Sequence, residues 1–188
     1  PLNIGAMAAL IGVDTNIVEE IRSKYVEKDE IIDIGNDNAP GQFVISGHNS
    51  IVDKVIANHK ALGIKRAIKL PVSAPFHCRL MEKARENMES YIQDLELLSP
   101  KLILVNNVGA APLTETNKIK DSLVEQITNT VRWRESIDNM CDLGVDNFIE
   151  IGAGNVLSGL VKRINKTVNS ISIQNIENIE NYINILEG

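Results

Sequence analysis

The alternation of hydrophobic and polar positions in the first part of the chain predicts strands and helices that follow one another closely. Apolar runs typical of strands lie at 5–12, 31–34, 42–47 and 67–72. Apolar residues spaced three and four apart, as on one face of a helix, lie at 15–24 and 50–62. The polar, glycine-containing stretch 35–41 predicts a long loop between the second and third strands.

Polar residues mark the expected ends of these helices. Asp14, Thr15 and Asn16 are N-cap candidates for the first helix. Ser50 followed by Asp53 resembles a capping box at the start of the second. The charged segment 24–30 is expected to end the first helix, and Gly63 to end the second. The order strand, helix, strand, strand, helix, strand is the split βαβ or ferredoxin-like arrangement, which we expect as a small subdomain over residues 1–76.

Residues 77–188 show a different rhythm. Helical periodicity is expected at 80–97, 119–127, 131–141, 156–164 and in a last helix through Tyr182 and Leu186. Continuous apolar runs predict buried strands at 102–108 and 147–151, and a further strand is expected at 170–173. Strands that alternate with helices indicate an α/β fold with a parallel sheet. The strands are fewer than in a usual sheet, so this part looks incomplete.

Composition and charge exclude several classes of protein. The chain has 188 residues, 44% of them hydrophobic, and a net charge of −6. An acidic protein is a poor match for nucleic acid, because phosphates need a basic surface. No apolar run is long enough for a membrane span, and no secretory leader opens the chain. Cys78 and Cys141 have no metal-type spacing and favour a reducing compartment, so we expect a cytoplasmic protein.

His77 is the candidate general base. It follows Pro71 and Pro75, which stiffen the approach and are expected to keep it extended, and it lies where a strand gives way to a helix. The ring of a general base must be correctly oriented toward the proton it removes, and a stiff position of this kind would fix that orientation. The alternative is a boundary histidine with satisfied hydrogen bonds. Cys78 would point to the opposite face in an extended segment, so we expect it to be a packing residue.

Other polar groups leave alternatives open. His48 and His59 have no carboxylate or cysteine at metal-ligand spacing and are expected at the surface or in loops. The turn Gly152–Asn155 precedes a helix and either cradles a phosphate or is a tight structural turn. Lys162 and Arg163 either meet an acidic partner or oppose the negative end of their own helix.

Several segments, in order, resemble one family. They are Gly5–Ala9, Asn36–Gln42 with Val44–Gly47, Pro75–His77, Asn106–Val108, Leu123–Gln126 with Val131–Trp133, and Glu150–Gly152 with Val156–Leu157. Together these segments closely resemble malonyl-CoA:acyl-carrier-protein transacylases of bacterial fatty acid synthesis. The resemblance covers nearly the whole chain. It implies that residues 1–76 are the ferredoxin-like small subdomain and that 77–188 are the C-terminal part of the α/β-hydrolase-like large subdomain.

The resemblance also implies roles for single residues. His77 would take the proton of a serine that accepts malonyl from coenzyme A, before the acyl group passes to the thiol of acyl carrier protein. Gln126 would orient this histidine through its backbone carbonyl. Substrate-binding roles would fall on Met7 and Phe76 in the malonyl pocket, and on Asn38 and Gln42 in a polar loop beside it. The bulk of Phe76 would disfavour a branched methylmalonyl group. The family needs no metal and no cofactor.

The chain also departs from the family pattern. No position matches the serine elbow, the arginine that pairs with the malonyl carboxylate, or one of the oxyanion-hole groups. The chain therefore resembles a C-terminal portion that should be inactive alone, since the base lacks its nucleophile. The alternatives are a non-catalytic ferredoxin-like binding module, and an acyltransferase of a polyketide or malonate-decarboxylase pathway.

Overall fold

The computed structural model describes residues 4–25 and 29–187, and it has an α/β fold. Its contacts divide the chain into two compact units, residues 1–136 and 137–188. The boundary between these two units does not coincide with the subdomain boundary expected between residues 76 and 77, because the first unit continues to Ser136. As a boundary between family subdomains it stays a prediction. Within the described ranges, the helices are too short or too polar to span a bilayer.

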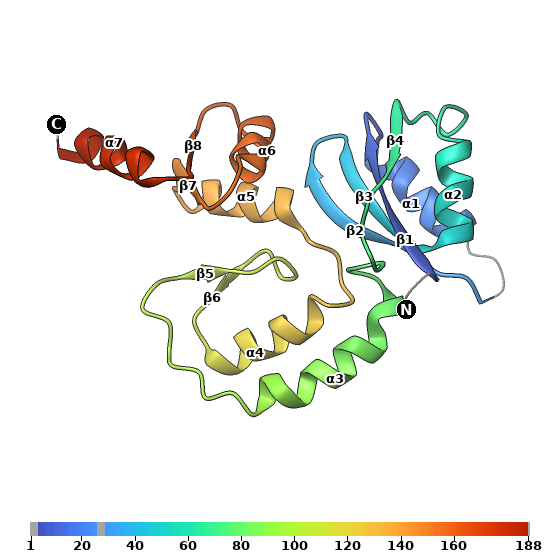
Figure 1. Cartoon of the computed structure of the whole chain (residues 1–188), viewed down its shortest axis with the longest axis horizontal. Coiled ribbons are helices and arrows are strands. Elements are labelled where there is room, and N and C mark those ends of the chain that lie inside the picture. Colours follow the sequence, from blue (N-terminus) through green and yellow to red (C-terminus); the bar gives the residue numbers. More distant parts are fainter. Residues whose placement is uncertain (1–3, 26–28, 188) are drawn as a thin grey trace. The chain divides into compact units, whose positions relative to one another are not determined.

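The first unit is built on a four-stranded sheet with strand order β2-β3-β1-β4 (Figure 1). Its elements in chain order are β1 (Gly5–Ile11), α1 (Thr15–Lys24), β2 (Ile32–Ala39), β3 (Gln42–His48), α2 (Asn49–Ala57) and β4 (Arg66–Lys69). All neighbouring strands are antiparallel. The six expected elements are therefore confirmed in type and order.

The core of this unit lies between the sheet and the two helices. Alternate residues of β1 (Ala6, Ala8 and Leu10) face apolar residues of α1 and α2 in one buried cluster. Because side chains alternate across a strand, Met7 belongs to the opposite face, away from α1 and α2.

The predicted helix starts are right in one case and wrong in the other. The side chain of Asp14 caps α1 by accepting a hydrogen bond from the backbone N–H of Asn16. The predicted capping box of α2 is absent: Ser50 donates to Glu30, and Asp53 pairs with Lys69. Partners distant in sequence thus take both side chains. The first helix ends at Lys24, and part of the charged segment expected to end it, residues 26–28, lies outside the described residues.

The long loop predicted at 35–41 is wrong. β2 continues to Ala39, and the reversal is a tight turn at Pro40 and Gly41, where Gly41 has a φ of 72°. The polar residues remain in the sheet because β2 stays paired with β3, with irregularities of register after Ile34 and Asp37. Asp37 is also paired with an arginine, so its charge does not favour a loop.

Residues 79–136 add two long helices and a small hairpin to this unit. The elements are a 3₁₀ turn η1 (Arg79–Met81), α3 (Glu82–Gln93), β5 (Leu104–Val105), β6 (Pro112–Leu113), α4 (Thr116–Glu125) and the start of α5 (Trp133–Asp142). α3 and α4 lie side by side, with Lys120 Nζ donating to the carbonyl of Gln93 at 2.8 Å (Figure 1).

The buried strand predicted at 102–108 is wrong. Only Leu104 and Val105 form a strand, and they pair antiparallel with Pro112 and Leu113. The side chain of Leu102 is 82% exposed. An apolar run is buried only where other elements cover it, and the described residues supply no such cover here.

The second unit contains a two-stranded parallel sheet of β7 (Asn147–Ile151) and β8 (Asn169–Ile173), connected by α6 (Val156–Ile164) and followed by α7 (Ile176–Glu187). The strands and helices expected here are confirmed in position. Burial of β7 is not confirmed, because Ile151 is 82% exposed. Among the described residues, β7 pairs with β8 alone.

Candidate functional site

The turn that carries His77 approaches Gly35 of β2, next to Met7. β4 ends at Lys69, earlier than expected, and the chain bends at residues 73–74 and turns at 76–77, with the Phe76 N–H donating to the carbonyl of Ala74. His77 itself has a φ of 58°, in the left-handed region. The extended approach predicted from the two prolines is therefore wrong in its last residues, although the predicted switch to a helix follows at once.

The residues after His77 fix this turn against the sheet. Cys78 is fully buried, its Sγ donates to the carbonyl of Pro75 at 3.1 Å, and burial raises the pKa of the thiol. Cys78 is thus a packing residue, as predicted. The backbone N–H of Arg79 donates to Asp33 Oδ2 at 3.0 Å, and its guanidinium pairs with the same carboxylate. Asp33 and Arg79 had no distinguishing signal in the sequence.

The ring of His77 contacts the C-terminal end of α4. His77 Nδ1 lies 2.8 Å from the backbone carbonyl oxygen of Gln126. A carbonyl oxygen only accepts, so Nδ1 carries the proton and donates. In the neutral ring Nε2 is then unprotonated and can accept a proton. The ring is thus held in the tautomer that a general base at Nε2 requires.

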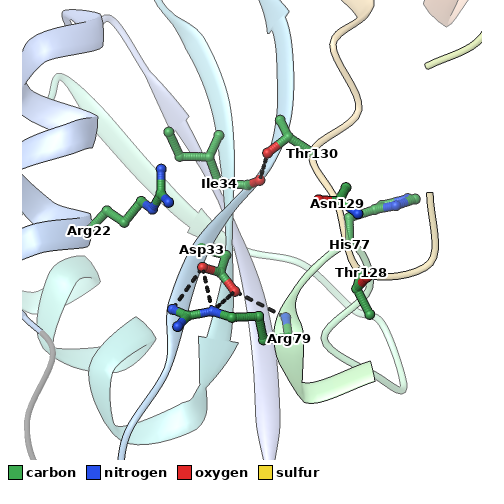
Figure 2. A pocket seen from close by; sticks show the side chains of 8 residues that line it. All are labelled: Arg22, Asp33, Ile34, His77, Arg79, Thr128, Asn129 and Thr130. Atoms are coloured by element: carbon green, nitrogen blue, oxygen red, sulfur yellow. Dashed lines mark hydrogen bonds and ion pairs between the residues drawn. The ribbon is translucent and has the colours of Figure 1, made fainter. Parts of the chain in front are cut away.

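Two cavities meet at His77. The polar one, about 250 Å³, is lined by Arg22, Asp33, Ile34, His77, Arg79, Thr128, Asn129 and Thr130. Figure 2 shows the Asp33–Arg79 ion pair of this cavity, and the hydrogen bond from Thr130 to the carbonyl of Ile34. The other, about 320 Å³, is apolar and lined by Phe76, His77, Met81, Ala84, Met88, Gln126 and Ile127. A reacting group at His77 would thus have polar and apolar surroundings on different sides.

Met7 and Phe76 both lie close to the backbone of Gly35 in β2. A Cβ on Gly35 would lie 3.3 Å from Met7 Cε and 3.5 Å from the carbonyl oxygen of Phe76. Met7 is buried, whereas Phe76 is 40% exposed and lines the apolar cavity. Gly35 thus lies next to the Met7 side chain and the Phe76 backbone, whereas the Phe76 side chain lines the apolar cavity beside His77.

Asn38 and Gln42 lie at the far end of the β2–β3 hairpin. Gln42 pairs with Ala39 across the tight turn and with Ile11 of β1. Neither Asn38 nor Gln42 lines a cavity that contains His77. Their substrate-binding roles stay a prediction, and nothing in the described geometry brings them to the histidine.

The turn at Gly152–Asn155 is a structural turn in this chain. The backbone N–H groups of Leu157 and Ser158 at the start of α6 donate to the carboxylate of Glu150, at 3.1 and 2.8 Å. Hydrogen bonding from Ser158 lowers the pKa of Glu150. The chain's own anion thus occupies the place that a phosphate would take. Glu150 lies two residues before the first glycine of the turn. This spacing was the signal available in the sequence.

The remaining histidines have local roles. His48 Nδ1 accepts from the N–H of Ile31, and His59 Nδ1 lies 2.8 Å from the carbonyl of Ile56. In the described part of the chain, His, Cys, Asp and Glu form no group of three or more suited to a metal ion. Lys162 and Arg163 lie in the last turn of α6, where they oppose the negative end of that helix.

Comparisons with known proteins agree on one family. No family model matches the chain. A curated relative from Staphylococcus aureus, "Malonyl CoA-acyl carrier protein transacylase", is 43% identical over 177 residues, which are 94% of this chain and 58% of the relative. The chain therefore spans somewhat more than half the length of the curated relatives it matches.

Solved structures give the same result. An acyl-carrier-protein-S-malonyltransferase from Bartonella henselae matches all of this chain and 60% of its own, with a TM-score of 0.93 and 39% identity. A malonyl-transacylase solved in complex with a type II PKS acyl-carrier protein matches 98% of this chain and 60% of its own, with a TM-score of 0.94 and 33% identity. The fold and the sequence thus point to the same proteins.

Proposed function

Because the chain is homologous to malonyl CoA-acyl carrier protein transacylases over 94% of its length, we propose that it is the C-terminal portion of such an enzyme. The enzyme would move a malonyl group from coenzyme A to the phosphopantetheine thiol of acyl carrier protein. The single observation that carries the proposal is the contact between His77 Nδ1 and the Gln126 carbonyl, since it leaves Nε2 ready to act as a base.

The proposed chemistry uses His77 twice. A serine outside this chain attacks the malonyl thioester, Nε2 of His77 takes the serine proton, and the proton passes to the departing thiol of coenzyme A. The carrier thiol then loses its proton to Nε2 and attacks the acyl-serine, and the proton returns to the serine. Gln126 stabilises the imidazolium that forms in each half, because its carbonyl accepts from Nδ1.

The substrate would lie in the cavities beside His77. We assign Met7 and Phe76 to the malonyl pocket, since both lie close to Gly35, with Asn38 and Gln42 further out. The apolar cavity beside Phe76 suits an uncharged part of the substrate or of the enzyme. The net charge of −6 favours a protein that binds no nucleic acid. The two free cysteines favour a reducing compartment, and we assign the enzyme to the cytoplasm.

The architecture supports the proposed subdomains. The connectivity β1-α1-β2-β3-α2-β4 with strand order β2-β3-β1-β4 is that of a ferredoxin-like small subdomain, which we assign to residues 1–76. The parallel β7–β8 pair with α6 between them suits the end of an α/β-hydrolase-like sheet, which we assign to 77–188.

The test replaces His77 in a complete enzyme. The chain is fused behind the portion of the Staphylococcus aureus relative that it does not span, and malonyl transfer from malonyl-CoA to the carrier protein is followed by intact mass. We expect His77→Asn to lower the rate about 100- to 10,000-fold, the usual worth of a general base. Asparagine is chosen because it tolerates the left-handed backbone of this position.

The matched control is His59→Asn, since His59 also contacts a backbone carbonyl through Nδ1 but lines neither cavity. We expect its rate to equal that of the parent. A folded fusion that transfers no malonyl group, or a His77→Asn variant as active as the parent, would contradict the proposal. Folding of each fusion is checked by circular dichroism and its unfolding midpoint.

A second candidate differs only in the carrier. One structural relative was solved with a type II PKS acyl-carrier protein, so a polyketide carrier is the alternative acceptor. Offering the active fusion equal amounts of a fatty acid carrier and a polyketide carrier separates the two. An acyltransferase of a malonate-decarboxylase pathway predicts transfer to the carrier protein of that pathway instead. A non-catalytic binding module predicts no transfer to any carrier.

A further inference from the structure

The C-terminal end of α4 is joined to the edge of β2. The Thr130 hydroxyl donates to the carbonyl of Ile34 at 2.6 Å, and the N–H of Val131 donates to the carbonyl of Gly35 at 2.8 Å. The N–H of Asp37 returns a bond to Val131. Figure 2 shows Thr130 of this junction, residues 130–131, with its bond to Ile34. The junction follows the turn that presents the Gln126 carbonyl to His77.

In the turn between α4 and the junction, the carbonyls of Glu125 and Gln126 have different partners. Asn129 donates to the carbonyl of Glu125 through both its backbone N–H and its side-chain amide, at 3.1 and 2.7 Å. Glu125 is thereby satisfied within the turn. The next carbonyl, that of Gln126, follows the last residue of α4 and contacts His77 Nδ1 at 2.8 Å.

The turn that carries His77 and the turn that carries Gln126 are both hydrogen-bonded to β2. The turn that carries His77 is held to β2 by Asp33 and the backbone N–H of Arg79. The turn that carries Gln126 is held to β2 by Thr130 at Ile34, the residue directly after Asp33. The 2.8 Å contact therefore depends on how tightly each turn is held to neighbouring residues of one strand.

We propose that Thr130 is a positioning residue for His77: its hydroxyl bond to Ile34 fixes the turn that aims the Gln126 carbonyl at Nδ1. The inference rests on the proposed function for its effect on turnover. Its effect on the histidine ring is independent of that function, because the contact exists without substrate.

The test compares Thr130→Val, which keeps the shape but loses the hydroxyl, with Thr130→Ser, which keeps the hydroxyl. Nitrogen NMR of the histidine rings in the fusion reports the fraction of His77 with a proton on Nδ1. We expect Thr130→Val to reduce this fraction, Thr130→Ser to restore it, and Thr116→Val at the other end of α4 to leave it unchanged.

In the active fusion we expect Thr130→Val to lower kcat about 3- to 10-fold, the worth of one hydrogen bond, with KM unchanged. A purely structural role would lower the amount of folded enzyme and leave the ring signature alone. An unchanged ring signature overturns the inference, and so does an unchanged kcat in an active fusion. A parent fusion without activity contradicts the proposed function instead, and the NMR comparison then decides the inference.

Discussion

His77 combines a reactive side chain with an unusual backbone. Its φ of 58° lies in the left-handed region, which asparagine, aspartate and histidine tolerate better than other residues with a Cβ. The neighbouring groups hold this conformation, since Cys78 is buried and bonded to Pro75, and Arg79 is bonded to Asp33. The backbone strain is thus confined to the residue whose side chain meets both cavities.

At this scale, a β-branched residue at position 77 should destabilise the first unit. We expect His77→Val to lower the free energy of unfolding by about 1–2 kcal/mol relative to His77→Asn, since branching at Cβ crowds a left-handed backbone. Urea unfolding followed by circular dichroism measures the difference. Equal midpoints and slopes for the two variants would show that the turn relaxes freely.

Glycines report how closely the elements approach one another. Gly47 of β3 lies between β1 and β2, and a Cβ there would be 2.2 Å from the carbonyl oxygen of Ile31. Gly159 lies inside α6, and a Cβ there would have no neighbour within 4 Å. The same substitution should therefore have opposite effects at the two positions.

We expect Gly47→Ala to destabilise the first unit by about 1–3 kcal/mol, because backbone atoms would have to move. Gly159→Ala should stabilise α6 by about 0.5–1 kcal/mol, since alanine loses less conformational freedom in a helix. Thermal unfolding of the isolated chain measures both. A stabilising Gly47→Ala would show that the strands separate without cost.

Glu150 links β7 to the start of α6 and makes that link sensitive to acid. Its pKa is lowered, so its contribution to stability is complete above the ordinary pKa of a glutamate and is lost as the pH falls through the lowered value. We expect Glu150→Gln to unfold earlier than the parent at neutral pH and to lose less on acidification. Melting temperatures across the acid range measure this, and parallel curves would contradict it.

The element types were predictable from periodicity, and the exceptions have physical causes. The ladder to β3 and the arginine partner of Asp37 keep residues 35–39 in a strand despite their polar side chains. Pairing of Ser50 with Glu30 removed a predicted cap. The contact of His77 with Gln126 followed from the resemblance alone, whereas Thr130 and Asp33 could not be predicted, because their partners become neighbours only when the sheet forms.

Across the whole molecule, the exposed apolar side chains stand out. Leu98 and Leu102 between α3 and β5 are 88% and 82% exposed, and Ile151 of β7 is as open as Leu102. Monomeric proteins rarely expose apolar residues in groups without a partner. Under the proposed function, the portion of the enzyme outside this chain would cover them.

We therefore expect the isolated chain to bind an apolar dye and to self-associate at micromolar concentration. Leu98→Ser with Leu102→Ser should reduce both, and the active fusion should show neither. Dye fluorescence and sedimentation velocity make the comparison. An isolated chain that stays monomeric and does not bind the dye would mean that other residues of the chain bury these side chains.

The central place of β1 in the four-stranded sheet has a consequence for synthesis on the ribosome. Of the four strands of this sheet β1 is synthesised first, yet it is hydrogen-bonded between β3 and β4, and β4 ends only at Lys69. Its apolar residues therefore stay unpaired until the later strands have been synthesised. Pairing between strands so distant in sequence is slow and prone to errors. Nascent chains halted before Arg66 has emerged should therefore recruit chaperones, whereas longer ones should release them.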